Sequence, residues 1–193
     1  MRHLKDGVAH LNAYLDDHAY LLDALLELMQ CDFREEDLQF ARDLSELLLE
    51  QFEDRAAGGF FFVSHDHEAL IHRAKPGHDN ATPAGNGIAA FALQRLGHLI
   101  GEPRYLAAAE RALKLFYAPL ERQSGGFVSL ATALDEYLSP PQTVVLRGEA
   151  GALAACSART PGLPPRGGRW NPSGRRCGAA AGSTPPTRTA SRT

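Results

Sequence analysis

Apolar residues recur at helical spacing over five stretches of the chain. The first stretch runs from Leu15 to Met29, and the second from about Glu35 to Phe52. After a break rich in glycine and phenylalanine, the spacing returns from about Ala84 to Leu99 and from about Arg104 to Tyr117. A fifth, shorter stretch runs from about Ser129 to Leu138. Because residues three or four positions apart share one face of an α-helix, the pattern predicts five helices and an all-α fold.

The connections between these stretches are short. Residues 31–34 separate the first two helices, and Gly101 ends the third just before Pro103 opens the fourth. Helices joined by so few residues pack antiparallel, so we expect two αα-hairpins. Thr82 followed by Pro83 also predicts an N-cap and a first-turn proline at the start of the third helix.

One motif occurs twice and marks a tandem repeat. Gly58-Gly59-Phe60 follows the first pair of helices, and Gly125-Gly126-Phe127 follows the second pair 67 residues later. We expect both motifs to be short extended pieces. Helical hairpins repeated in this way cannot bury their apolar faces alone and pack against their neighbours.

Charge divides the chain into two unlike parts. Residues 1–156 hold all 23 acidic residues and 13 of the 20 basic ones, a formal charge of −10. Residues 157–193 hold seven arginines and no acidic residue, a charge of +7, and helical spacing stops there. We therefore divide the chain into a helical domain, residues 1–150, and an Arg/Pro/Gly-rich tail, residues 151–193, which we expect to be disordered. The abrupt change also predicts that the tail is a frameshift product.

Several classes of protein are disfavoured by what the sequence contains. Cys31, Cys156 and Cys177 are too few and too scattered for a disulfide framework or a zinc site. The first residues lack the apolar core of a signal peptide. No apolar run approaches the roughly 18 residues that cross a membrane. We expect a cytoplasmic protein without a membrane partner.

Three segments of the chain resemble one protein family. Leu15-Asp16-Asp17-His18-Ala19-Tyr20 resembles its Leu-Asp-Asp-Tyr-Ala-Phe signature, and His78-Asp79-Asn80-Ala81-Thr82-Pro83-Ala84-Gly85-Asn86 resembles Tyr-Asp-Gly-Ala-Thr-Pro-Ser-Gly-Asn. The third segment is Gly58-Gly59-Phe60-Phe61-Phe62. The family comprises thioredoxin-domain-containing proteins related to spermatogenesis-associated protein 20. Their C-terminal (α/α)6 toroid is similar to N-acylglucosamine 2-epimerases and six-hairpin glycosidases.

This resemblance runs from about Lys5 to Gly148 and implies a partial α/α toroid, a fragment with two full hairpins and part of a third. Two departures accompany it. Nothing in the chain resembles the thioredoxin-like domain, and the family continues in ordered sequence where this chain, from Ser157, becomes rich in Arg, Pro and Gly.

The resemblance also implies a site, because inner helices of such toroids begin around a central cavity. We expect Asp17 and Asp79 to form a catalytic pair, since two carboxylates across a cavity can act as general acid and base on a sugar. The expected substrate-binding residues stand at the same helix starts: Asp16, His18, Asn80, Thr82 and Asn86.

Structural roles remain open for the same residues. Asp16 or Asp17 can cap the first helix, and Asp79 with Asn80 can form a turn that bonds its own backbone. Asn86 can bind a loop carbonyl in place of a ligand. His18 stands where the family signature has an aromatic residue.

No metal, cofactor or nucleic-acid partner is expected. His65-Asp66-His67 offers ligands in a loop, but no His pair has the helical spacing of a zinc site. The tail is basic, but it contains a single aromatic residue and no RNA-binding motif. We expect a small carbohydrate ligand and self-association through exposed hairpin faces.

Three functions stay open at this point. The first is a sugar epimerase, isomerase or glycoside hydrolase as the parent protein, with this fragment inactive alone. The second is a non-catalytic scaffold that binds a carbohydrate or a protein. The third is a nonfunctional gene remnant.

Overall fold

The computed structural model describes residues 2–5, 8–31, 33–67, 72–140, 168–170 and 176–178. Its elements in chain order are the strands β1 (Arg2–Lys5) and β2 (Val8–Asn12), the helices α1 (Leu15–Cys31) and α2 (Glu35–Leu47), the π-helical turn η1 (Leu48–Phe52), α3 (Gly85–Ile100), α4 (Pro103–Arg122), the 3-10 turn η2 (Ser124–Gly126), α5 (Val128–Leu138), β3 (Gly168–Trp170) and β4 (Arg176–Gly178). Each of the five predicted helices is present, and the helical class is confirmed.

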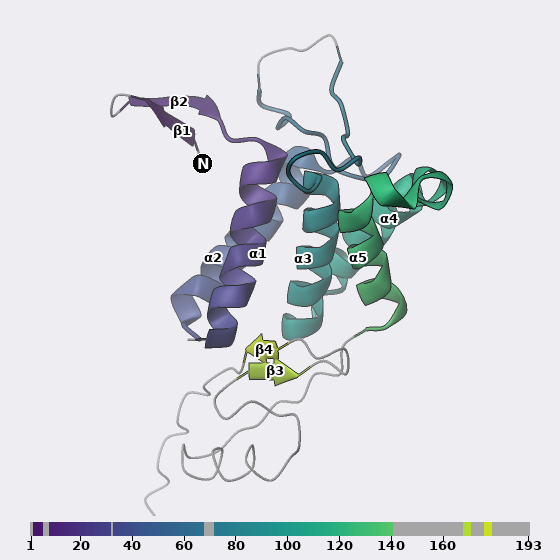
Figure 1. The fold of residues 1–193 in the computed structure, drawn as a ribbon. Helices are drawn as coiled ribbons and strands as arrows, with labels where there is room; N and C mark the ends of the chain where they lie inside the picture. Colours follow the sequence, from purple (N-terminus) through teal and green to yellow (C-terminus); the bar gives the residue numbers. More distant parts are fainter. Residues whose placement is uncertain are drawn as a thin grey trace, which may run out of the picture.

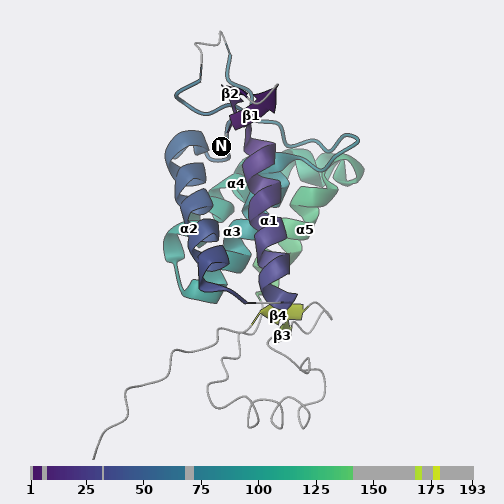
Figure 2. The same ribbon diagram turned by 90° about the vertical axis from the view of Figure 1, so that its left-hand side faces the viewer.

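The helices form two layers. In Figure 1, α1, α3 and α5 stand side by side, and each begins at the upper end of the molecule. The helix α3 packs between α1 and α5, while α2 packs on α1 and α4 packs on α3 and α5. In Figure 2, which looks along this row with α1 in front, α2 stands to the left of α1, and α3, α4 and α5 lie farther back. The described residues of the loop that joins η1 to α3 and the turn η2 also lie at the upper end.

The central helix α3 approaches its neighbours closely because it carries glycine at the points of contact. A Cβ added at Gly87 would lie 2.2 Å from the Ser129 hydroxyl oxygen of α5. One added at Gly97 would lie 2.8 Å from the side chain of Leu106 in α4. Alanines 89, 90 and 92 on the same helix are completely buried. The small side chains of α3 thus set the spacing of the core.

The two Gly-Gly-Phe motifs adopt different structures. Gly58 and Gly59 have φ of 81° and 73°, a left-handed backbone that favours glycine, and Phe60 forms a β-bridge with Glu53. The second motif was also predicted to be extended, and this prediction is wrong, because η2 coils it into a 3-10 turn. Only Gln123 separates α4 from this turn, which leaves no length of chain for an extended return.

The start of α3 also differs from the prediction. Thr82 was expected to cap the helix, but α3 begins at Gly85, and its N-cap residue is Ala84, whose side chain makes no cap. The backbone N–H of Ala84 instead donates to the Asp79 carboxylate over 2.7 Å. A side chain five residues upstream therefore fixes where the helix begins.

The four short strands were not among the predicted elements. β1 and β2 pair antiparallel before α1, and no hairpin was predicted there. β3 and β4 also pair antiparallel, within residues 168–178. Apart from these two strands, the predicted tail, residues 151–193, lies outside the described residues.

Candidate functional site

Two of the hollows in the described part of the molecule differ in what lines them. The first, here the acidic hollow, has a volume of about 510 Å³. It is lined by Asn12, Ala13, His18, Asp43, Glu46, Leu47, Glu50, Gln51, Phe52, Ser64 and Asp66. The second, here the α3 hollow, has a volume of about 530 Å³. It is lined by Asp23, Asp79, Asn80, Ala81, Thr82, Pro83, Ile88, Phe91, Gly125, Val128, Ser129 and Thr132.

The predicted site residues are divided between these hollows. Asp79, Asn80 and Thr82 line the α3 hollow, and His18 lines the acidic hollow. The remaining three, Asp16, Asp17 and Asn86, line neither. The two carboxylates expected to act as a pair, Asp17 and Asp79, therefore do not share a hollow.

Asp79 holds the starts of two helices together. One carboxylate oxygen accepts the Ala84 N–H before α3, and the other accepts the Ser129 N–H in the first turn of α5 over 2.9 Å. The Ser129 hydroxyl also donates to Asp79. Burial alone would raise the pKa of Asp79, but the hydrogen bonds from the Ser129 hydroxyl and from the amides of Ala84, Ser129 and Val128 lower it below its ordinary value. The carboxylate is thereby held ionised as a double helix cap.

Asp17 and its neighbour Asp16 occupy the first turn of α1 in different ways. Asp17 accepts the Tyr14 N–H over 2.8 Å and so caps α1, the structural role left open for it beside catalysis. One oxygen of Asp16 is buried without a hydrogen-bond partner beside Gly85, whose backbone N–H faces it. Burial and, second, the charge of Asp17 raise the pKa of Asp16, and the Gly85 amide opposes them.

Asn86 fastens the first Gly-Gly-Phe motif to α3. Its side chain is completely buried, and its Oδ1 accepts the Phe60 N–H over 2.7 Å. Its Nδ2 donates to the carbonyl oxygens of Phe60 and Pro76, both at 2.9 Å. The Asn86 amide group therefore donates to backbone carbonyls of the loop, which is the structural role that the sequence analysis left open for this residue.

Asn80 and Thr82 form the rim of the α3 hollow. The Asn80 N–H donates to the Thr82 carbonyl over 3.0 Å, so these residues form a turn above α3. Both are exposed. Tyr20 of α1 fastens the same segment, because its hydroxyl donates to the Pro83 carbonyl.

Apolar and charged residues that the sequence reasoning missed make the walls of the α3 hollow. Ile88 and Phe91 extend from α3, and Asp23 from α1. The Arg95 guanidinium forms ion pairs with Asp23 at 2.9 Å and Glu27 at 2.7 Å, and lies 5.2 Å from the Phe91 ring centroid. Burial raises the pKa of Asp23 despite the opposing charge of Arg95. The spacing of Ile88, Phe91 and Arg95, which places them on one helix face, is a signal that could have found this wall.

His18 is buried at the base of the acidic hollow, with 2% of its surface exposed. Its Nδ1 lies 2.8 Å from the Tyr14 carbonyl oxygen, and its ring lies 5.1 Å from that of Phe52. Burial lowers the pKa of His18, and the hydrogen bond to Tyr14 opposes this only in part. The ring is thus held neutral at pH 7.

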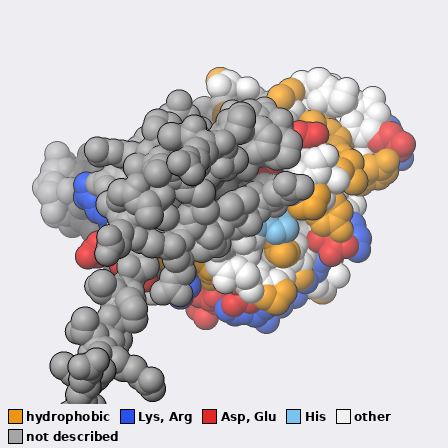
Figure 3. Space-filling view, turned by 90° about the horizontal axis from the view of Figure 1, so that it is seen from below, with side chains coloured by type: hydrophobic (Ala, Val, Ile, Leu, Met, Phe, Trp, Pro, Cys, Tyr) orange, Lys and Arg blue, Asp and Glu red, His pale blue; other side chains and the backbone are white. Residues whose placement is uncertain are grey.

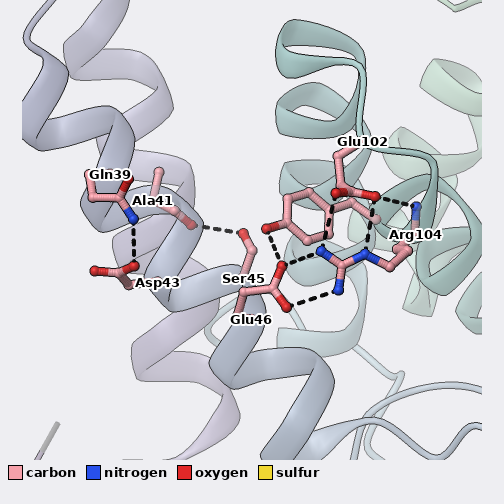
Figure 4. A network of polar contacts seen from close by, with 8 residues as sticks. Gln39, Ala41, Asp43, Ser45, Glu46, Glu102 and Arg104 are labelled. Atoms are coloured by element: carbon pink, nitrogen blue, oxygen red, sulfur yellow. Dashed lines mark hydrogen bonds and ion pairs between the residues drawn. The ribbon is translucent and has the colours of Figure 1, made fainter.

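Carboxylates of α2, of η1 and of the loop after η1 also line the acidic hollow. Glu46 accepts hydrogen bonds from Arg104 at 2.8 and 3.1 Å and from the Tyr105 hydroxyl at 2.7 Å, a network that ties α2 to α4 (Figure 4). Asp43 in the same figure accepts from Gln39. Glu46 and Asp43 lie on the polar face of α2, which the sequence pattern predicts to be exposed to solvent.

Among the described residues, no group of three or more His, Cys, Asp or Glu side chains is placed to hold a metal ion. Within the same residues, no helix is both long and apolar enough to cross a membrane.

The chain was compared with known proteins. No family model matches it. A Caenorhabditis elegans protein described as "Uncharacterized protein B0495.5" is 28% identical over 149 residues. The matched part makes up 76% of this chain and 20% of the worm protein. The chain thus spans about a fifth of the length of this relative, and the likeness carries no functional assignment.

Proposed function

We propose that the helices form an arc of an α/α toroid, as in the family that the sequence resembles, and that its α3 hollow binds a small carbohydrate without turning it over. Three parallel helices, α1, α3 and α5, with antiparallel α2 and α4 packed on one side, are the arrangement that such an arc requires (Figures 1 and 2). The thioredoxin-linked parent and its place in carbohydrate metabolism belong to the same proposal.

The observation that carries the binding proposal is the lining of the α3 hollow. A polar rim of Asn80 and Thr82 stands over apolar walls that include Ile88 and Phe91. Carbohydrates present hydroxyl groups at their edges and apolar C–H groups on their faces, so a polar rim above an aromatic wall is complementary to them. The volume of about 530 Å³ admits a mono- or disaccharide.

Binding is favoured over catalysis because of how the two acidic residues are used. Asp79 accepts hydrogen bonds on both oxygens, and Asp17 accepts the Tyr14 N–H. A general acid must carry a proton near neutral pH. Burial raises the pKa of Asp79, but its hydrogen bonds outweigh burial and lower the pKa below its ordinary value.

Isothermal titration of the full chain with N-acetylglucosamine tests the proposal. We expect weak saturable binding that Phe91→Ala weakens about fivefold, the value of an aromatic contact of about 1 kcal/mol. Phe40→Ala is the matched control, because Phe40 is an exposed phenylalanine of α2 that lines neither hollow. Equal affinity in the two variants, or no binding at millimolar sugar, would sink the proposal.

Catalysis by a longer homologue is the second candidate, and Asp16 favours it. Its unpaired buried oxygen and raised pKa, caused mainly by burial, are properties of a general acid. The discriminating variant is Asp16→Asn at the matching position of an intact homologue. Loss of turnover with binding retained supports the enzyme, and absence of turnover in the unmutated homologue favours the binding protein.

Self-association is also part of this proposal, and α5 is the helix that favours it. Val128, Tyr137 and Leu138 are 57%, 41% and 70% exposed, and they lie on the last helix of the row. Seen from below, apolar side chains gather over part of the described surface (Figure 3). We expect the protein to form oligomers that Leu138→Lys weakens, and a monodisperse monomer in light scattering would contradict this.

A further inference from the structure

The Arg-rich tail contacts the helical domain through its described residues. The strands β3 and β4 both pack against α1. Figures 1 and 2, which differ by a quarter turn, both show the two strands just beyond the end of α1, at the lower end of the molecule. The helix α5, which precedes the tail, also ends there (Figure 1). The tail therefore leaves the helices at the same end at which α1 finishes and α2 begins.

The helical domain carries excess negative charge at this lower end. Residues 31–37, which lead from α1 into α2, include four acidic residues and one arginine. Glu35 and Glu36 of this segment are exposed in the first turn of α2. The last turn of α1 holds no basic residue, so no side chain of that turn offsets the partial negative charge of its final carbonyl groups. A cationic segment is therefore favoured beside the end of α1.

The tail has the complementary charge. Residues 1–156 carry a formal charge of −10, and residues 157–193 carry +7. Three of the seven arginines, Arg169, Arg175 and Arg176, fall within residues 168–178, where β3 pairs with β4. A segment that is joined covalently to its binding surface meets it at a high effective concentration, so weak attraction between exposed charges is enough to hold it there.

We propose that residues 168–178 dock on the lower end of the helical domain, beside the end of α1, by attraction between their arginines and the carboxylates of Glu35 and Glu36. The occupant of this surface is thus a segment of the same chain. The loop that forms the rim of the α3 hollow lies at the upper end (Figure 1), so the proposal stands independently of carbohydrate binding.

The cysteines of the full chain test this docking. Cys31 ends α1, Cys177 lies in β4, and Cys156 lies between α5 and β3 in the sequence. Oxidised glutathione converts two of these thiols to one disulfide bond and is itself reduced to two glutathione thiols. Peptide mapping by mass spectrometry then measures the docked product, in which Cys31 is joined to Cys177, and the competing product, in which Cys31 is joined to Cys156.

Chain length alone favours the competing product. Cys156 lies 18 residues beyond Leu138, the last residue of α5, and Cys177 lies 39 residues beyond it. Loop closure over these lengths favours Cys156 about threefold. With docking, we expect the docked product to prevail at low ionic strength, and its excess to disappear in about 1 M salt, which screens exposed charges.

Two double variants separate docking from attraction to total charge. Glu35→Gln plus Glu36→Gln should lower the ratio of docked to competing product about fivefold, because two exposed ion pairs are lost. Glu50→Gln plus Glu121→Gln is the matched control and should leave the ratio unchanged. It removes the same charge from exposed residues of η1 and α4. Circular dichroism verifies the fold of each variant.

Three results would overturn the proposal. The first is a competing product that prevails at low ionic strength, and the second is an equal loss in the two double variants. The third is a docked product that forms only between two chains, at doubled mass, which would assign the tail to a second copy. If Cys31 is not oxidised, the rate of trypsin cleavage after Arg176 replaces the product ratio. We expect cleavage about fivefold faster in Glu35→Gln plus Glu36→Gln than in the control, and equal rates contradict docking.

Discussion

The α3 hollow and the acidic hollow have nearly the same volume but are built on opposite principles. In the α3 hollow, both oxygens of Asp79 accept hydrogen bonds that cap α3 and α5, and Asn86, outside this hollow, holds the loop before α3. Among the residues that line the acidic hollow, Gln51 instead has a buried side-chain oxygen without a hydrogen-bond partner in the described part of the chain. The difference teaches that polar residues at helix starts can use their hydrogen bonds to hold helices and loops together. A hollow beside a helix face that the sequence predicts to be solvent-exposed can instead contain a buried group without a hydrogen-bond partner.

The largest expected effect comes from removing the buried hydrogen bonds of Asn86. Asn86→Ala removes three hydrogen bonds to buried backbone groups, so we expect the free energy of unfolding to fall by about 3 kcal/mol, at about 1 kcal/mol for each bond. Urea denaturation measures the loss. Asn80→Ala, in the exposed rim, is the control and should cost less than about 0.5 kcal/mol. Similar losses in the two variants would show that Asn86 is not a framework residue.

An intermediate effect is expected at Asp79. Asp79→Asn should lower the free energy of unfolding by about 1–2 kcal/mol at pH 7, because an amide group cannot accept the same set of N–H donors on both of its ends. The hydrogen bonds lower the folded pKa of Asp79 below the unfolded value, against the effect of burial. The carboxylate therefore stabilises the fold above about pH 4, and this contribution is lost as the pH falls through the folded pKa.

Thermal denaturation of both proteins at several pH values checks this prediction. The difference between wild type and Asp79→Asn should be constant from pH 7 to about pH 5 and should shrink below about pH 4. A difference that does not change with pH would mean that the Asp79 charge contributes nothing to capping.

The smallest expected effect sharpens the acidic side of the comparison. Burial lowers the folded pKa of His18 below its unfolded value, so protonation favours the unfolded chain. Stability should therefore decline as the pH falls below about 6.5, and His18→Phe should remove this decline. His65→Ala, an exposed histidine outside both hollows, should keep it. Loss of the decline in both variants would assign it to histidines in general.

Much of the fold could be predicted because it depends on local spacing. The five helices follow from apolar residues that recur every three or four positions. The hairpin of β1 and β2 was missed although Asp6-Gly7, a dipeptide typical of tight hairpin turns, stands between the two strands. The second Gly-Gly-Phe motif was misassigned because the same three residues adopt a different backbone when fewer residues separate them from the preceding helix.

The site could be predicted only as a set of polar residues near helix starts. Nothing in the sequence shows that the Asp79 carboxylate reaches Ser129, 50 residues further on. The same holds for Asn86, whose partner Phe60 lies 26 residues upstream. Such contacts depend on which helices become neighbours, and hydrophobic periodicity gives the face of each helix but not its partner.

The carboxylate of Asp79 also couples the folding of two segments. The start of α3 and the start of α5 share a single acceptor group, so both caps are present together only after a loop of 50 residues has closed. Hydrogen exchange at the amides of Ala84 and Ser129 should then follow one common opening event, although α4 lies between them in the chain. The upper end of the molecule thus behaves as one cooperative unit whose formation is a late, non-local step.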